Sequence, residues 1–145
     1  MKLKIKKLRE QAKLPTRGTA GSAGMDLYAC IDEKITINPG DLKIIPTGIA
    51  IALPDNSCAA YLYARSGLGV KHGICLSNGV GVIDADYRGE LLVSIHNHSS
   101  VSASVAPGQR IAQLVIMPVA CPVFTEADAL SDTDRGAGGF GSTGR

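Results

Sequence analysis

The sequence predicts an all-β protein, a sandwich or barrel of short strands in a single domain. Short apolar stretches recur along most of the chain, and glycine, proline, asparagine and aspartate separate them at short intervals. No apolar pattern with a 3.6-residue period persists over the length of a helix. With 145 residues, of which 45% are hydrophobic, the chain has the size of one domain with its own core.

The expected strands are short runs rich in aliphatic and β-branched residues, each bounded by turn residues. They lie at residues 3–8, 31–37, 42–53, 58–64, 79–83, 90–96, 101–105 and 110–119. Pro46 interrupts one of these runs, which indicates an edge strand, a bulge or two separate strands. A single short helix is expected at residues 66–72.

The sequence divides into a β domain at residues 1–134 and a glycine-rich C-terminal arm at residues 135–145. The arm contains G-x-G-x-x-G, but no helix can follow it, so the dinucleotide-binding interpretation fails. The lysine of a P-loop is also missing. Two interpretations stay open for the arm alone. It is either a flexible tail or a segment whose backbone N–H groups and polar side chains close around an anion.

Composition excludes several classes of protein. A net charge of +2 is too small to indicate a protein that binds long nucleic acid through its phosphates. The four cysteines form no C-x-x-C pair, which argues against zinc and dithiol redox sites. Residues 1–10 lack the apolar core of a secretory signal, and no stretch is long enough for a membrane helix. We therefore expect a cytoplasmic protein that binds neither nucleic acid nor a membrane.

Two further segments carry polar side chains that suggest catalysis or phosphate binding. Residues 81–90 (GVIDADYRGE) are either a solvated hairpin tip or a strand end that holds a carboxylate to deprotonate water. Residues 64–69 (ARSGLG) are either a turn capped by Ser66 or a phosphate cradle built from Arg65, Ser66 and backbone N–H groups. Each segment alone leaves both interpretations open.

Taken together and in order, the segments resemble the five signature motifs of the trimeric dUTPase family. The matching segments are residues 23–27 (AGMDL), 65–68 (RSGL), 79–90, 107–113 (PGQRIAQ) and 135–144. The resemblance implies a jelly-roll-like β fold and a homotrimer with three active sites shared between subunits. Each site would take the second and fourth motifs from one subunit, the third from a neighbour and the arm from the remaining one. It also implies Mg²⁺-assisted hydrolysis of dUTP to dUMP and pyrophosphate.

The resemblance assigns a role to each matching residue. Asp84 is expected to be the general base that activates the attacking water. Mg²⁺ is expected to be held mainly by the substrate phosphates, with Asp26 acting through water. The expected substrate-binding residues are Arg65, Ser66, Gly67 and Gln113 for the phosphates, Asn78, Gly81, Val82 and Ile83 for uracil, Tyr87 and Leu92 for the sugar pocket, Arg135, Gly141, Ser142 and Thr143 for the γ-phosphate, and Phe140 for stacking on uracil. Gln109 is the alternative to Gln113 for the amide contact.

Three other functions fit the sequence less well. The related dCTP deaminases carry a second serine where this chain has Gly67, and a glutamate base on the strand where it reads LLVSI at residues 91–95. A catalytically idle binding trimer is disfavoured because Asp84 and the arm are intact. An unrelated β-sandwich recognition domain leaves the order of the five motifs unexplained.

Overall fold

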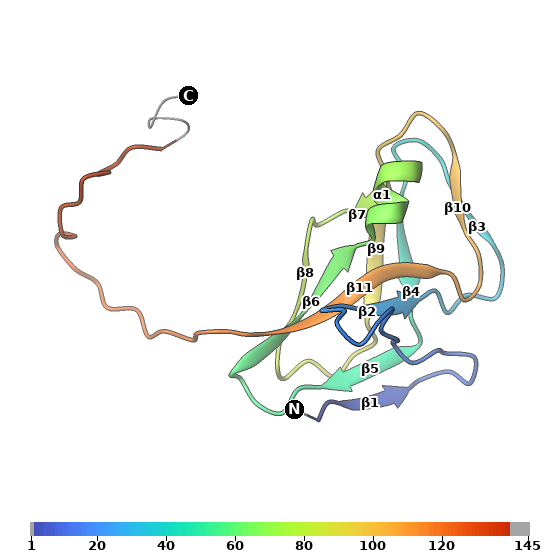
Figure 1. Cartoon of the computed structure of the whole chain (residues 1–145), viewed down its shortest axis with the longest axis horizontal. Coiled ribbons are helices and arrows are strands. Elements are labelled where there is room, and N and C mark those ends of the chain that lie inside the picture. The colour runs from blue at the N-terminus through green and yellow to red at the C-terminus, as the bar shows by residue number, and fades with distance from the viewer. Residues whose placement is uncertain (1, 140–145) are drawn as a thin grey trace.

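The computed structural model describes residues 2–139, which form short strands and a single short helix (Figure 1). The strands are β1 (Lys4–Lys7), β2 (Met25–Tyr28), β3 (Ile35–Ile37), β4 (Leu42–Pro46), β5 (Ile49–Ala52), β6 (Cys58–Ala64), β7 (Ile74–Leu76), β8 (Gly81–Ile83), β9 (Leu92–Asn97), β10 (Ala103–Val105) and β11 (Arg110–Pro118), and the helix is α1 (Ser66–His72). The all-β prediction is therefore confirmed.

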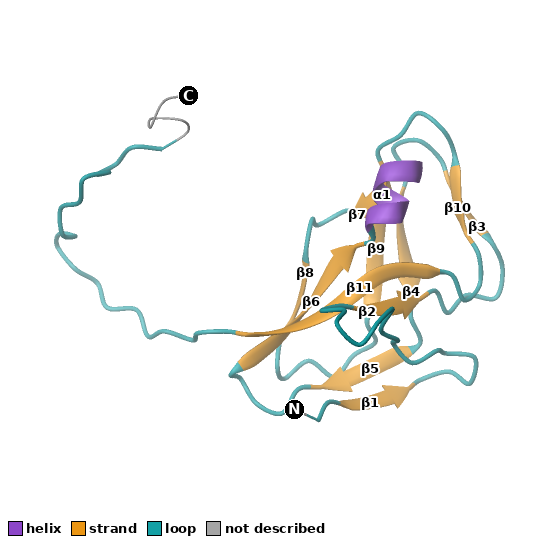
Figure 2. Ribbon diagram, in the orientation of Figure 1, coloured by secondary structure: helices purple, strands orange, loops and turns teal. Residues whose placement is uncertain are grey.

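The strands form two main sheets and two ribbons, all of them antiparallel (Figure 2). One sheet has four strands in the order β2-β11-β6-β8, and the other has three in the order β4-β9-β7. The ribbons are β1-β5 and β10-β3. β11 is the longest strand and lies between β2 and β6, so it connects the segments that carry the first, second and fourth motifs.

The core is aliphatic, as the near absence of aromatic residues requires. Its largest fully buried side chains come from strands of both sheets, and each contributes about 1.5–3 kcal/mol by leaving water. Two buried polar side chains have hydrogen-bond partners. Asn97 donates to the carbonyls of Ile37 and Val101, both at 2.9 Å, and the Thr47 hydroxyl donates to the Leu91 carbonyl at 2.6 Å. These bonds connect strands and loops that are far apart in sequence.

Several boundaries differ from the expected ones. The run at residues 42–53 is two strands, because Pro46 ends β4 and Gly48 adopts a φ of +70° that a turn requires. Strands β2 and β7 were not expected, and each is defined by pairing with a strand later in the chain, β2 with β11 and β7 with β9. The expected helix is confirmed and ends at Gly73, whose φ is +63°.

Beyond β11 the chain leaves the β body as an extended segment (Figure 1). Its last hydrogen bonds to the body are Val119 N–H to the Ser57 carbonyl at 3.0 Å and Cys121 Sγ to the Asn56 carbonyl at 3.5 Å. From there to residue 139, the described hydrogen bonds are all local to the segment. A division into residues 1–134 and 135–145 stays a prediction.

Candidate active site

A cavity of about 130 Å³ opens between the hairpin that carries β8 and strand β9. Its lining includes residues that the family resemblance assigns to the uracil slot and its surroundings, namely Asn78, Gly81, Val82, Ile83 and Leu92. They come from a turn, an edge strand and the start of β9, which lie up to fourteen residues apart in the sequence (92 − 78). The fold therefore brings these predicted residues together.

Glycine at position 81 is required by the close approach of β8 to β6. Gly81 lies opposite Leu62, and a Cβ built on Gly81 would lie 3.0 Å from the Leu62 Cβ. The preceding turn contains Gly79 with a φ of +72°. Within the described residues, β8 pairs with β6 alone. Backbone N–H and C=O groups on its other edge are therefore free to pair with a ligand.

Asp84 follows the last residue of β8 directly and is exposed. The turn after it is closed by Tyr87 N–H, which donates to the Asp84 carbonyl at 3.2 Å, and by Arg88, which donates to the Ala85 and Tyr87 carbonyls at 2.7 and 2.9 Å. Among residues 2–139, no hydrogen bond or ion pair engages the Asp84 carboxylate. The carboxylate is thus held by a tight turn while its oxygens stay available.

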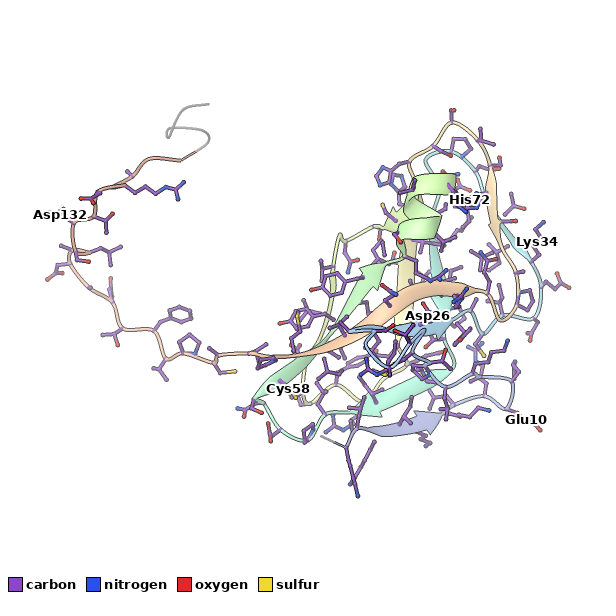
Figure 3. All side chains as sticks on the ribbon, in the orientation of Figure 1. Glu10, Asp26, Lys34, Cys58, His72 and Asp132 are labelled. Atoms are coloured by element: carbon purple, nitrogen blue, oxygen red, sulfur yellow. The ribbon has the colours of Figure 1, made fainter. Side chains whose placement is uncertain are left out.

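The second cluster is centred on Asp26, which lies within the β body (Figure 3) and is only 5% exposed. Its Oδ1 accepts from Arg65 Nε at 2.9 Å, and its Oδ2 accepts from Arg110 Nη1 at 3.1 Å. Gln113 on β11 pairs with Asp26 on β2 and with Tyr63 on β6. The predicted phosphate residues Arg65 and Gln113 are therefore brought to the same region, beside the carboxylate predicted to contact the metal.

Ser66 and Gly67 form the first turn of α1, immediately after Arg65. The N-cap residue is Arg65, without a side-chain capping bond, so the alternative in which Ser66 caps a turn is wrong. The carbonyl of Arg65 accepts the N–H groups of Leu68 and Gly69, both at 3.0 Å. The space beside Gly67 is open, since nothing lies within 4 Å of a Cβ built there.

Within one chain, the two clusters lie apart. Asp84 continues β8 beyond Ile83, which lies opposite Ala60, whereas Arg65 continues the other end of β6. Ala60 and Arg65 are five residues apart (65 − 60). At about 3.3 Å per residue this corresponds to roughly 16 Å. The cluster around Asp84 and the cluster around Arg65 therefore lie toward opposite ends of β6.

The structure reaches only part of the predicted arm. Arg135 is exposed, and its Nε donates to the Gly138 carbonyl at 3.2 Å, away from both clusters. Figure 3 shows the neighbouring Asp132 far from Asp26. The predicted contacts of Phe140, Gly141, Ser142 and Thr143 lie outside the described residues.

Two contributors were missed in the sequence. Arg110 lies in the fourth motif, but its role depends on an irregular register between β11 and β2, next to Tyr28, that places its guanidinium beside Asp26. Gly89 looks like an ordinary turn residue, yet the Tyr87 ring packs directly against it. Neither contact leaves a periodic signal in the sequence.

Comparison with known proteins supports the predictions. A family model described as dUTPase matches residues 10–144. The deoxyuridine 5'-triphosphate nucleotidohydrolase of Polynucleobacter necessarius is 51% identical over 145 residues, covering 100% of this chain and 97% of the relative. The protein of the same name from Burkholderia multivorans is 52% identical over 143 residues, covering 99% and 97%.

Solved structures agree with these relatives. A variant of the dUTPase of Staphylococcus bacteriophage 80alpha with dUpNHpp superposes with a TM-score of 0.90 at 27% identity, and 99% of each chain is covered. The class of protein is thus a nucleotide hydrolase with a jelly-roll-like β fold. More particularly, the chain belongs to the dUTPase family. The predicted family, fold class and enzyme class, dUTP diphosphatase, are confirmed. No helix among residues 2–139 has the length and apolar character needed to cross a membrane.

Proposed function

We propose that this chain hydrolyses dUTP to dUMP and pyrophosphate by in-line attack of water on the α-phosphorus. The observation that carries the proposal is the juxtaposition of a base-sized slot with Asp84 at the end of the same edge strand. One strand would then hold the uracil ring of the substrate and also carry the catalytic carboxylate. This fixes the position of the carboxylate relative to the substrate, as near-attack geometry requires.

The slot supports selection of uracil through the backbone of β8. Its free N–H and C=O groups alternate along the edge and can pair with the carbonyl and imide groups of uracil. Cytosine carries an amino donor where uracil has a carbonyl, so it leaves two donors facing each other, and such mispairing discriminates strongly. The close packing at Gly81 keeps the slot narrow, which disfavours the methyl group of thymine.

Asp84 is proposed as the general base. A carboxylate that must deprotonate water needs oxygens within hydrogen-bond reach of that water and no stronger competing partner. The tight turn from Asp84 to Tyr87 restricts the backbone, and the carboxylate oxygens have no partner among residues 2–139. The proton then passes from the attacking water to Asp84 as pyrophosphate leaves, without a covalent intermediate.

Arg65 and Gln113 are proposed to hold the phosphates, together with Ser66 and Gly67. Asp26 accepts Arg65 Nε, so the terminal guanidinium nitrogens stay available for phosphate oxygens. The planar guanidinium suits two such oxygens at once. This division of labour gives the buried carboxylate a positioning role toward Arg65.

The residues fit a Mg²⁺ ion that arrives with the triphosphate. Among residues 2–139, no group of three or more His, Cys, Asp or Glu side chains could form a metal site. Both Asp26 oxygens accept an arginine N–H, yet each keeps a second lone pair for a water molecule. Asp26 would therefore contact the ion through water, with most ligands supplied by phosphates. The ion would neutralise charge on the transferring phosphoryl group.

A homotrimer with shared sites is proposed because one chain cannot complete a site. The separation of roughly 16 Å along the backbone of β6 supports an arrangement in which one subunit supplies the general base and another supplies the phosphate-binding residues. The extended segment after β11 supports this arrangement. Its apolar side chains Val123, Phe124 and Leu130 are almost fully exposed in the single chain and would be covered by a neighbouring subunit.

The proposal is tested by Asp84→Asn, which keeps the size of the side chain but removes the base. We expect turnover to fall by about 10²–10⁴-fold while the dissociation constant for a non-hydrolysable dUTP analogue stays unchanged. Asp86→Asn is the matched control, because Asp86 is an exposed carboxylate in the same turn. Near-normal turnover of the Asp84 variant, or an equal loss in the control, would refute the assignment.

A further inference from the structure

The Tyr87 ring occupies the space that a side chain at position 89 would need. A Cβ built on Gly89 would lie 2.5 Å from Tyr87 Cζ and 3.0 Å from Cε2, with the hydroxyl oxygen closer still. Real Cβ atoms essentially never come within 3.0 Å of a heavy atom, so any larger residue must displace the ring. The ring is the free end of a side chain, and Tyr87 as a residue is 42% exposed, so the ring has room to move.

The backbone at position 89 does not itself require glycine. The glycines that adopt a positive φ are found elsewhere in residues 2–139, and Gly89 is not among them. Alanine can therefore adopt this backbone conformation without strain. What demands glycine here is the Tyr87 ring, which makes Gly89→Ala a specific probe of the position of that ring.

The acceptor that anchors the ring is fixed to the body of the protein. Tyr87 Oη donates to the Glu90 carbonyl at 3.0 Å. The Glu90 side chain in turn accepts the Gly48 N–H at 2.7 Å, and its other oxygen lies 3.7 Å from Arg9 Nη2. This carbonyl cannot follow a displaced ring, so the hydroxyl bond must break when the ring moves.

The next residue strengthens the same anchor. Leu91 is fully buried, its N–H donates to the Ile49 carbonyl at 2.9 Å, and its carbonyl accepts the Thr47 hydroxyl at 2.6 Å. Glu90 and Leu91, which follow the turn and precede β9, are thus both hydrogen-bonded to residues 47–49 between β4 and β5. The Tyr87 ring has one anchored position, over Gly89 and against Glu90.

We propose that Gly89 determines sugar specificity, because its missing side chain lets the Tyr87 ring lie where it excludes a ribose 2′-hydroxyl. Gly89 is a positioning residue that acts through Tyr87. The inference rests on the proposed function and on the family resemblance, which places Tyr87 in the sugar pocket. Displacing the ring opens space beside the sugar, so Gly89→Ala admits UTP while Asp84 and the phosphate residues stay in place.

The test compares kcat/KM for dUTP and UTP in the full-length wild-type and Gly89→Ala proteins. We expect the dUTP preference to fall by about tenfold or more, mainly through improved use of UTP, since steric exclusion of one added hydroxyl is worth discrimination of about 10². Gly21→Ala is the matched control, because nothing lies within 4 Å of a Cβ at that exposed position. A preference within twofold of wild type in a folded Gly89→Ala protein would overturn the inference.

A double variant separates positioning from general loosening of the hairpin. In a Tyr87→Ala background the ring is already absent, so adding Gly89→Ala should leave the dUTP-to-UTP ratio unchanged. A further fall of the ratio in that background would contradict action through Tyr87.

A readout independent of activity separates this inference from the proposed function. The chain has four tyrosines, so the ring carbon resonances of isotope-labelled tyrosine can be assigned by substitution. The Tyr87 resonance should shift in Gly89→Ala and not in Gly21→Ala, and an unchanged resonance would contradict the packing. A wild-type protein that cleaves neither nucleotide would overturn the proposed function and the sugar specificity, whereas the resonance would still report the ring position.

Discussion

Replacing Asp26 by asparagine tests how the phosphate cluster is held together. The carboxylate is buried, and it accepts arginine N–H groups at 2.9 and 3.1 Å. Asparagine offers one oxygen and one N–H₂ group, so one arginine must then face a donor. The variant also removes the negative charge that lies between two guanidinium groups.

The magnitude follows from the exposure of the two arginines. The Arg65 side chain is 23% exposed and the Arg110 side chain is 51% exposed. Water therefore screens the ion pair between Arg110 and Asp26 much more than the pair between Arg65 and Asp26. A hydrogen bond to a charged group is worth about 1.5–3 kcal/mol, and the exposed pair contributes at the low end or less. We expect a loss of about 2–3 kcal/mol, which lowers Tm by about 4–12 °C in a domain of this size.

The assay is thermal unfolding at one fixed protein concentration, because assembly makes Tm depend on concentration. It is paired with the affinity for a non-hydrolysable dUTP analogue, which should weaken because Arg65 is no longer oriented. Asp32→Asn is the control, since Asp32 is exposed and accepts one hydrogen bond, from Gln11 at 3.3 Å. It should stay within about 0.5 kcal/mol of wild type.

Unchanged stability together with unchanged affinity in Asp26→Asn would refute the reasoning. Normal stability and affinity combined with a higher Mg²⁺ requirement would also contradict the arginine clamp. That second result would instead favour a role for Asp26 confined to the metal.

Three further predictions concern the arm, the extended segment and the slot. Deleting residues 135–145 should leave Tm and assembly unchanged but strongly lower kcat/KM for dUTP, and an unfolded product would contradict this. Serine at all three of Val123, Phe124 and Leu130 should make the assembly dissociate at higher protein concentration, measured by analytical ultracentrifugation; an unchanged dissociation profile would count against shared sites. Gly81→Ala should cost about 1–3 kcal/mol and weaken dUTP binding, because its Cβ meets Leu62; wild-type Tm and affinity would show that the close approach of β8 to β6 does not require glycine.

Much of the fold could be predicted from local patterns. Turn residues at short intervals and β-branched runs located most strands, and Pro46 marked the break between β4 and β5. β2 escaped prediction because its four residues form a strand only through pairing with β11. Such short strands are defined by tertiary partners more than by intrinsic propensity.

The candidate site likewise contains residues that could be predicted from the sequence and contacts that could not. Asp84 and residues 79–83 are contiguous, so their order in the sequence was enough to indicate a slot with a carboxylate at its end. The clamp on Asp26 joins residues that are 84 positions apart, and it depends on an irregular register at Arg110. The contact between Tyr87 and Gly89 depends on one rotamer of a ring. Neither could be read from periodicity or composition.

Pyrophosphate release from purified protein with Mg²⁺, compared for dUTP, dCTP, dTTP and UTP, tests the central claim most directly. The account predicts strong preference for dUTP and loss of release on chelation. Release from all four nucleotides would contradict the roles of the slot and Tyr87, and release from none would contradict the proposed hydrolysis itself.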